Sequence, residues 1–327
     1  MLTNISDSLL LKVIGLKKHF PVRRGMLQRT TGWIKAVDGV DFIIEPGKTL
    51  GLVGESGCGK STVARLLLRL LAPDAGEILF RGNDLSFLSE KQMRPFRKEI
   101  QIVFQDPYGS LNPRMTAGQA IEEGLRRSDL KDRSANSARL KALLRKVGLS
   151  PESADRFPHE FSGGQRQRIG IARALSVNPS LIVCDEPVSA LDVSIQAQII
   201  NLLKDLQDDL GVSYLFISHD LNVVGYLCHT VSVMYRGRIM EHAPCDAIFD
   251  APRHPYTRAL LAAGPDATRF REPPVLMTGE RAGEETGAFE GCEFQEQCAE
   301  KTAACGDPDI PFVEVGEGHY VRCKKFT

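Results

Sequence analysis

The sequence predicts an α/β fold built around a parallel β-sheet. Three short apolar segments support this prediction: residues 50–53 lead into a glycine-rich turn and a helix, residues 180–186 end in two carboxylates, and residues 212–219 end in a histidine. Because the carboxyl ends of parallel strands meet at one edge of a sheet, a ligand site is expected at that edge.

Length and composition are those of an ordinary globular protein. The chain has 327 residues, which suggests one large or two modest domains, and its 41 basic and 41 acidic side chains cancel. This balance gives no indication of a nucleic-acid partner. No uncharged apolar run is long enough to span a bilayer, so a cytosolic chain, free or docked on another component, is expected.

Residues 49–62, TLGLVGESGCGKST, predict a phosphate-binding loop between a strand and a helix. Glycines let backbone N–H groups point inward, and the helix N-terminus adds partial positive charge. Lys60 is expected to reach the β- and γ-phosphates, and the Ser61 hydroxyl is expected to bind Mg²⁺. The candidate nucleotide-binding residues of this stretch are Gly54, Glu55, Ser56, Gly57, Cys58, Gly59, Lys60, Ser61 and Thr62.

Apolar runs and turn residues predict β-strands within residues 11–47, at 77–80 and at 100–104. The basic insert at residues 20–33 is expected to be a solvated surface loop. Phe20 and Trp33 are candidates to stack on a nucleotide base.

A helical pattern covers about residues 117–147, and a second helix is expected to begin near Ser162. Ser162 and Gln165 have the spacing of a capping box. That motif does not require Gly163 and Gly164, which suggest close backbone approach to an anionic ligand.

The strand at residues 180–184 ends in Asp185 and Glu186. Asp185 suits Mg²⁺, directly or through water, and Glu186 suits polarising an attacking water. Residues 195–210 predict an amphipathic helix closed by Gly211. His219 ends the next apolar strand.

In this order the motifs resemble those of ABC transporter ATP-binding subunits, over about residues 10–260. The phosphate-binding loop resembles the Walker A motif, Gln105 resembles the Q-loop glutamine, and Phe161–Gln165 resembles the ABC signature. The sequence LIVCDE resembles Walker B, SALD resembles the D-loop, and His219 resembles the switch histidine. The resemblance implies a P-loop NTPase (RecA-like) core with an antiparallel β subdomain and a helical signature subdomain at about 107–175.

A narrower resemblance is to the ATPases of oligopeptide, dipeptide and nickel importers, most of all their second, F-type subunit. The stretches KHFPVRRG, VFQDPYGSLNPRM, DEPVSALDVSIQAQIINLL and HPYTRALL are similar to that family. It implies an ATPase that powers import of di- or oligopeptides, with a nickel importer of the same family or a non-transport ABC switch as alternatives. The solute itself is not identifiable from this sequence.

The resemblance also implies the roles of the residues and the partners. ATP held by Lys60, Ser61 and Asp185 of one subunit would meet Ser162 and Gly164 of another, with Gln105 sensing Mg²⁺ and water. Expected partners are a sister ATPase in a head-to-tail heterodimer, two transmembrane permease subunits and a substrate-binding protein, at the cytoplasmic face of the membrane. The expected catalytic residues are Lys60, Gln105, Glu186 and His219; the nucleotide-binding set adds Asp185, Gly163, Gln165 and Phe20, with Trp33 competing for adenine.

The remaining residues, 263–327, are expected to form a small irregular extension to an ATP-binding domain at 1–262. Residues 264–291 are rich in glycine and proline and are expected to be a linker. Cys292, Cys298, Cys305 and Cys323 follow, at intervals of five, six and seventeen residues. In a reducing compartment they favour a metal site, but the spacing alone does not choose between zinc, an iron–sulfur cluster and unliganded thiols. The family resemblance favours a [4Fe–4S] cluster over Zn²⁺.

Overall fold

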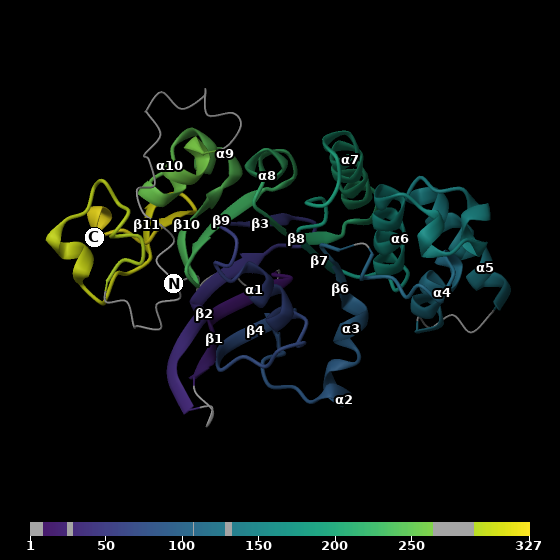
Figure 1. Cartoon of the computed structure of the whole chain (residues 1–327), viewed down its shortest axis with the longest axis horizontal. Helices are drawn as coiled ribbons and strands as arrows, with labels where there is room; N and C mark the ends of the chain where they lie inside the picture. Colours follow the sequence, from purple (N-terminus) through teal and green to yellow (C-terminus); the bar gives the residue numbers. More distant parts are fainter. Residues whose placement is uncertain (1–8, 25–28, 107, 128–132, 264–290) are drawn as a thin grey trace. The chain divides into compact units, whose positions relative to one another are not determined.

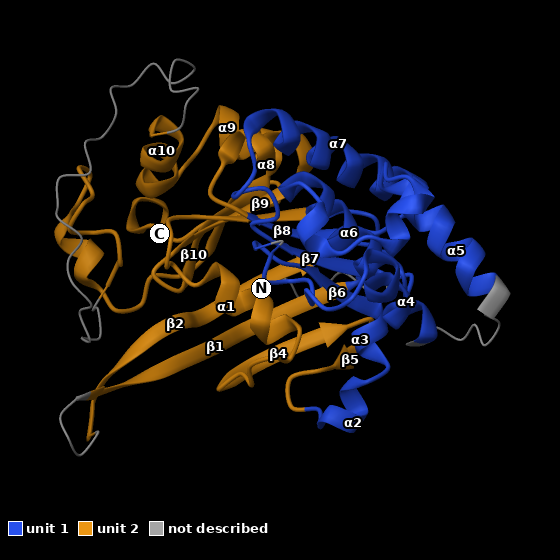
Figure 2. Ribbon diagram, turned by 45° about the vertical axis from the view of Figure 1, so that its right-hand side comes forward, with its two compact units in different colours: residues 1–10, 44–49, 88–217 blue, residues 11–43, 50–87, 218–327 orange. Residues whose placement is uncertain are grey.

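The computed structural model describes residues 9–24, 29–106, 108–127, 133–263 and 291–327. The linker expected at 264–291 lies outside this part of the chain, apart from Gly291. Two compact units interleave along the sequence (Figure 2). Unit 1 takes its residues from 1–10, 44–49 and 88–217, and unit 2 takes its residues from 11–43, 50–87 and 218–327.

Unit 1 contains a parallel arrangement of three strands and most of the helices. Strand β7 (Leu181–Asp185) pairs in parallel with β6 (Ile100–Val103) on one side and with β8 (Ser213–Ser218) on the other. All residues of β7 and β8 are buried, as their apolar runs predict. The helices are α2 (Glu90–Met93), α3 (Phe96–Glu99), α4 (Ala117–Arg127), α5 (Arg133–Lys146), α6 (Gly163–Leu175) and α7 (Val193–Leu210), with 3₁₀ turns η1 (Pro151–Asp155) and η2 (Pro158–Glu160).

The predicted helices of unit 1 are confirmed, with two adjustments. The helical pattern of residues 117–147 is divided between α4 and α5, and α6 packs on both of them as well as on α7 and β6 (Figure 1). Helix α7 begins two residues before its expected start because the Asp192 side chain accepts a hydrogen bond from the Ile195 N–H, at 3.0 Å. It ends at Gly211, whose φ of +66° closes the helix as expected.

Unit 2 contains a sheet of four strands in the order β2-β1-β4-β5, in which β4 pairs antiparallel with both β1 and β5 (Figure 1). These strands are β1 (Leu11–Arg24), β2 (Arg29–Ile44), β4 (Ala75–Phe80) and β5 (Asn83–Asp84). The prediction of a surface loop at residues 20–33 is wrong for 20–24 and 29–33, which continue β1 and β2. Exposed strand residues carry no alternation of buried and polar positions, so the sequence pattern resembled a loop.

The other strands of unit 2 lie in the order β11-β12-β10-β9-β3. Strand β3 (Thr49–Val53) pairs in parallel with β9 (Thr230–Tyr235), while β10 (Arg238–Pro244), β12 (His319–Val321) and β11 (Val313–Gly316) continue antiparallel. The helices are α1 (Lys60–Leu67), α8 (Leu221–Leu227), α9 (Cys245–Asp250) and α10 (Pro255–Ala262), with 3₁₀ turns η4 (Ala303–Gly306) and η5 (Lys324–Phe326).

The C-terminal segment is more regular than the sequence predicts, because two of its short stretches are strands. Strand β12 pairs with β10, with Glu241 opposite Val321 and His242 opposite Tyr320. Glu241 is fully buried, and His319 Nε2 lies 2.7 Å from its carboxylate. A buried carboxylate needs such a partner, so this pair attaches the end of the chain to the sheet.

Candidate functional site

The phosphate-binding loop predicted at Gly54–Thr62 lies in unit 2, between β3 and α1. Gly54 has φ +150°, and a Cβ atom there would lie 2.1 Å from the Met234 carbonyl oxygen. Gly59 has φ +114°, and its Cβ would lie 2.0 Å from the Ala36 carbonyl oxygen. Both positions therefore admit only glycine, and the loop turns directly into the N-terminus of α1, where anions bind.

Lys60 folds back over this loop. Its Nζ donates to the carbonyl oxygens of Gly54 and Glu55, each at 2.7 Å, and lies 3.7 Å from Cys58 Sγ. Only 4 % of the Lys60 side chain is exposed. A buried ammonium group paired with carbonyl oxygens is well suited to exchange them for the oxygens of a phosphate.

The loop is also held from outside by a tyrosine that the sequence analysis did not select. The Glu55 N–H donates to the Tyr256 hydroxyl at 3.0 Å, and Tyr256 is fully buried. Gly237 N–H donates to the Cys58 carbonyl at 2.9 Å. Burial raises the pKa of the Cys58 thiol, so Cys58 stays protonated at neutral pH and acts as a packing residue.

The remaining candidates of unit 2 occupy surface or half-buried positions. Ser56 and Gly57 are exposed, Ser61 and Thr62 are half-buried in the first turn of α1, and His219 is exposed just after β8. The two candidates for base stacking differ in their surroundings. Phe20 is a half-buried residue of β1 with Lys18 Nζ 5.7 Å from its ring centre, whereas Trp33 of β2 is 54 % exposed.

In unit 1 the structure brings together two residues predicted to be catalytic. Gln105, just after β6, donates from Nε2 to Glu186 Oε2 at 3.0 Å. Glu186 follows β7 with φ +47°, a strained value for a residue with a side chain, and its N–H donates to the Ile217 carbonyl at 3.0 Å. Asp185 is the buried last residue of β7. A carboxylate held in a strained turn at a strand end is typical of a functional site.

The capping box predicted at the start of α6 is present. The Ser162 side chain accepts from the Gln165 N–H at 3.4 Å, and the Ser162 N–H donates to the Gln165 side chain at 3.1 Å. Gly164 has a packing role as well: a Cβ there would lie 2.4 Å from Ile195 Cγ2 of α7. Close packing of α6 against α7 therefore explains part of the requirement for glycine at position 164.

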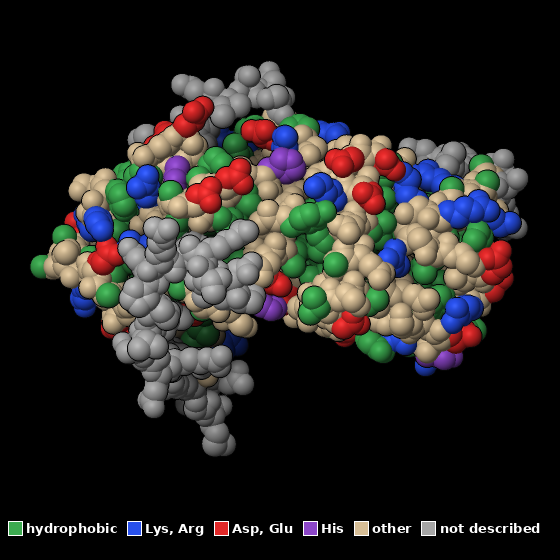
Figure 3. Space-filling view, turned by 90° about the horizontal axis from the view of Figure 1, so that it is seen from above, with side chains coloured by type: hydrophobic (Ala, Val, Ile, Leu, Met, Phe, Trp, Pro, Cys, Tyr) green, Lys and Arg blue, Asp and Glu red, His purple; other side chains and the backbone are tan. Residues whose placement is uncertain are grey.

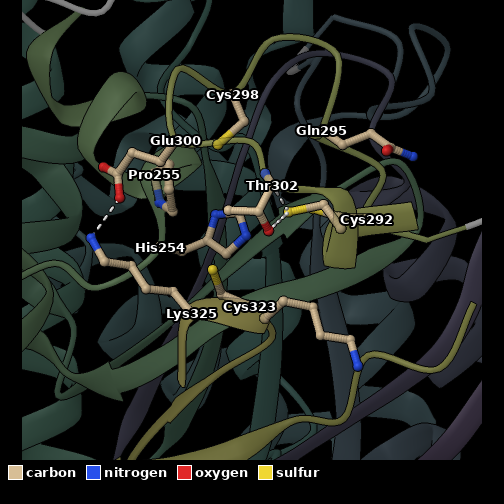
Figure 4. A pocket seen from close by; sticks show the side chains of 11 residues that line it. His254, Pro255, Cys292, Gln295, Cys298, Glu300, Thr302, Cys323 and Lys325 are labelled. Atoms are coloured by element: carbon tan, nitrogen blue, oxygen red, sulfur yellow. Dashed lines mark hydrogen bonds and ion pairs between the residues drawn. The ribbon is translucent and has the colours of Figure 1, made fainter. Parts of the chain in front are cut away.

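A second candidate site in unit 2 contains all four C-terminal cysteines. Cys292, Cys298, Cys305 and Cys323 line one cavity of about 300 Å³ together with His254 (Figure 4). Burial, with smaller contributions from Glu293, Cys305 and Cys323, raises the pKa of Cys292 to about 12. Within the described residues, no group of three or more His, Cys, Asp or Glu side chains is arranged to hold a single metal ion.

Comparison with known proteins decides the family. A family model described as "ABC transporter" matches residues 37–189, and one described as "Oligopeptide/dipeptide transporter, C-terminal region" matches residues 240–305. The oligopeptide transport ATP-binding protein AppF of Bacillus subtilis is 47% identical over the full length of both chains. This chain belongs to the ABC transporter ATP-binding proteins. Within that family it has the C-terminal region of oligopeptide and dipeptide transporters.

Other ABC ATP-binding proteins agree with this assignment. The probable peptide ABC transporter ATP-binding protein y4tS of Sinorhizobium fredii is 49% identical over 98% of this chain and 90% of that protein. The glutathione import ATP-binding protein GsiA of Salmonella choleraesuis is 48% identical, over 98% of this chain and 49% of that protein. The ATP-binding cassette MJ0796, solved as a dimer bound to ADP and phosphate, is 27% identical over 72% of this chain, with a TM-score of 0.64.

The ABC ATP-binding protein has a mixed charge and no membrane-crossing helix in its described part. Figure 3 shows acidic and basic side chains interspersed on the face that it presents, in keeping with the equal counts of 41 each. No helix in residues 9–263 and 291–327, as far as these are described, is apolar and long enough to cross a bilayer.

Sequence reasoning missed Tyr256 and His254 of this ABC protein. The stretch HPYTRALL carried a usable local signal, because proline at the first helical position predicts the start of α10 at Pro255. The contact of Tyr256 with Glu55 joins residues 201 positions apart, and no local pattern reveals it.

Proposed function

We propose that this chain is the ATP-hydrolysing subunit of an ABC importer of di- and oligopeptides. The assignment of di- and oligopeptides as the transported solutes has two supports. One is the family match of residues 240–305, and the other is the relatives named for oligopeptide, peptide and glutathione transport. Residues 1–262 would form the ATP-binding domain, and residues 263–327 the extension that is particular to these importers.

The observation that carries the catalytic part of the proposal is the hydrogen bond from Gln105 to Glu186 at 3.0 Å. Glu186 acts as the general base: its carboxylate orients the attacking water and takes its proton as the water attacks the γ-phosphorus. Gln105 fixes the rotamer of Glu186 and reports through the loop that follows β6 whether the site is engaged.

The phosphates are bound by the phosphate-binding loop and by the N-terminus of α1, which follows it. The backbone N–H groups of Gly54–Thr62 hold the β- and γ-phosphates, and Lys60 exchanges its carbonyl partners for phosphate oxygens. The Ser61 hydroxyl, Asp185 and the Gln105 amide oxygen are the hard ligands that Mg²⁺ prefers. When bound by these residues, Mg²⁺ would neutralise charge that develops on the transferred group. His219 and Lys60 stabilise the same charge, and Phe20 or Trp33 stacks on the adenine.

Two such subunits would act together. We propose that Ser162, Gly163, Gly164 and Gln165 of one subunit complete the nucleotide site of a sister subunit, head to tail. The half-buried or exposed positions of Ser162, Gly163 and Gln165 at the start of α6 support this role. The pair would dock on two permease subunits at the cytoplasmic face of the membrane and respond to a loaded substrate-binding protein.

The test is ATP hydrolysis by the reconstituted transporter, with the permeases, the sister ATPase and a peptide-loaded binding protein. We expect the loaded binding protein to stimulate hydrolysis and Glu186→Gln to lower the turnover by about 10²- to 10⁴-fold while ATP still binds. The control is Glu152→Gln, an exposed glutamate of η1, which should behave as wild type. Hydrolysis that is equally fast in the isolated chain, or unaffected by Glu186→Gln, would contradict the proposal.

We further propose that the four cysteines hold a [4Fe–4S] cluster, with Zn²⁺ as the alternative. The cavity that all four line supports a group larger than one ion. Thiols whose pKa is raised by burial, as those of Cys292, Cys298 and Cys323 are, become ligands when a bound cation compensates their charge. The cluster would have a structural role, since the segment is too small to build a core of its own. Iron, acid-labile sulfide and zinc are to be measured in chain purified without oxygen, for wild type and Cys298→Ser.

A further inference from the structure

His254 occupies a fixed position at the wall of the cysteine cavity. It is the N-cap residue of α10 and only 1 % exposed. Its backbone N–H donates to the buried Glu241 carboxylate at 2.9 Å, and the neighbouring Arg253 N–H does so at 2.6 Å. Figure 4 shows the imidazole ring among Cys292, Cys298 and Cys323, which together with it line the cavity.

The hydrogen bonds of the ring define its tautomer. Nδ1 accepts a hydrogen bond from the Tyr256 N–H at 3.0 Å, so Nδ1 carries no proton. The ring proton therefore resides on Nε2. Among the described residues, no acceptor reaches this buried atom with normal hydrogen-bond geometry, and the Arg322 backbone interacts with the ring only more weakly. An unpaired buried N–H group is energetically costly, and native proteins rarely leave one in place.

We infer that His254 is a hydrogen-bond donor to the group that the four cysteines hold, with Nε2–H directed at a thiolate or sulfide sulfur. This inference rests on the [4Fe–4S] cluster proposed above. An anionic sulfur is an acceptor that this cavity can supply, because four cysteines line it together with His254. Direct ligation by Nε2 is disfavoured, since it would move the proton to Nδ1 and break the bond from Tyr256.

Hydrogen bonds to the sulfurs stabilise the reduced, more negative cluster and so raise its reduction potential. His254 would therefore act as a residue that tunes the cluster and orients it, while the cysteines supply the ligands. Because the N–H group of His254 interacts with the charge of the sulfurs, its loss is expected to change the reduction potential of the cluster. The amount of bound iron is expected to change little.

The experiment compares reduction potentials in the full chain after anaerobic reconstitution with iron and sulfide, by titration followed with visible absorption and electron paramagnetic resonance. In His254→Asn, the Asn side chain still caps α10 but does not reach the cavity. In His254→Gln, the amide N–H₂ group restores a donor near the position of Nε2. We expect a lower potential in His254→Asn, a return toward wild type in His254→Gln, and full iron content in both.

The matched control is His242→Asn. His242 is also a buried histidine of unit 2, but its Nδ1 is paired with Ser232 Oγ at 2.8 Å and it does not line the cavity. This variant should keep the wild-type potential. Thermal unfolding of each variant separates loss of fold from loss of the donor.

Three outcomes would overturn the inference. An unchanged potential in loaded His254→Asn would exclude the donor role while leaving the cluster in place. Loss of iron in His254→Asn, with nitrogen hyperfine coupling in the wild-type spectrum, would make His254 a ligand. Zinc or no metal in the wild-type chain would remove the cluster and the inference together, and would leave the ATPase proposal unaffected.

Discussion

Gly54 and Gly82 both adopt positive φ angles, of +150° and +77°, but they differ in what surrounds them. A Cβ at Gly54 would lie 2.1 Å from the Met234 carbonyl oxygen, whereas nothing lies within 4 Å of one at Gly82. Backbone cannot yield as a flexible side chain does, so β9 and the phosphate-binding loop would have to separate.

We expect Gly54→Ala to destabilise the chain more than Gly82→Ala, for which the left-handed conformation alone costs about 1–2 kcal/mol. Gly54→Ala should also abolish binding of an ATP analogue, which Gly82→Ala should preserve. Denaturation in urea and calorimetric titration measure the two effects. Equal losses in both variants would mean that the backbone around Gly54 yields.

The charged groups of Glu186 and Lys60 are held in place in different ways. Glu186 accepts a hydrogen bond from Gln105 and has a strained backbone. Lys60 is held by two carbonyl oxygens at 2.7 Å. The Gln105 amide and the two carbonyl oxygens are neutral partners, which suits groups that must change partners when a nucleotide binds.

At the scale of elements, a hydrogen bond from the Glu55 N–H to the Tyr256 hydroxyl connects α10 to the phosphate-binding loop. Tyr256→Phe removes the hydroxyl that accepts from the Glu55 N–H and keeps the ring packed against Tyr235, 4.5 Å away between centroids. We expect a loss of about 1 kcal/mol in unfolding free energy and weaker binding of an ATP analogue.

The control for this change is Tyr226→Phe, on α8, where the side chain is 54 % exposed. It should alter neither the unfolding free energy nor the affinity measurably. If Tyr256→Phe binds the analogue as wild type does, the hydrogen bond to Glu55 contributes nothing to the form of the loop that holds nucleotide.

Asp38 joins three strands of unit 2 and makes their stability depend on pH. Burial disfavours its charged form, but hydrogen bonds and charges from Arg238, Lys35 and His19 outweigh burial and lower its pKa to about 2. Because the folded-state pKa lies below that of the unfolded chain, near 3.8, this stabilisation is complete above about pH 4. It is lost as the pH falls through about 2.

Asp38→Asn should therefore be less stable than wild type at neutral pH, by about 2 kcal/mol, and the difference should shrink between pH 4 and 2. Denaturant unfolding across that range measures it. Asp41→Asn, a nearby change that still accepts from the Gly15 N–H, is the control and should show no such narrowing. If the difference in unfolding free energy between Asp38→Asn and wild type stays constant from pH 4 to pH 2, the ion pairs of Asp38 are not its source.

At the scale of the whole molecule, the sequence predicts what neighbouring residues determine. The strands that end at Val53, Asp185 and Ser218, the capping box at Ser162 and the closure of α7 at Gly211 each have a local pattern, and the structure confirms them. Several residues that these patterns identified, Lys60, Asp185 and Ser162 among them, are those proposed above to act on the nucleotide.

Contacts between distant segments were not predictable in this way. The pairing of β12 with β10 depends on a buried Glu241–His319 pair, and the support of the loop by Tyr256 depends on a fold already formed. The clustering of four cysteines predicted a metal site, and the structure brings the four into the lining of one cavity. The position of the His254 ring in that lining has no signature in the sequence.

Phe294 lies between Cys292 and Cys298 in sequence, and its ring packs against Tyr256, with 5.4 Å between centroids. Tyr256 in turn accepts from the loop at Glu55. Tyr256 therefore contacts both the cysteine segment and the phosphate-binding loop, so the order of one can influence the order of the other. If the proposed group binds the cysteines, thermodynamic reciprocity applies: whatever factor that group imposes on the affinity for ATP, ATP would impose on the affinity for the group.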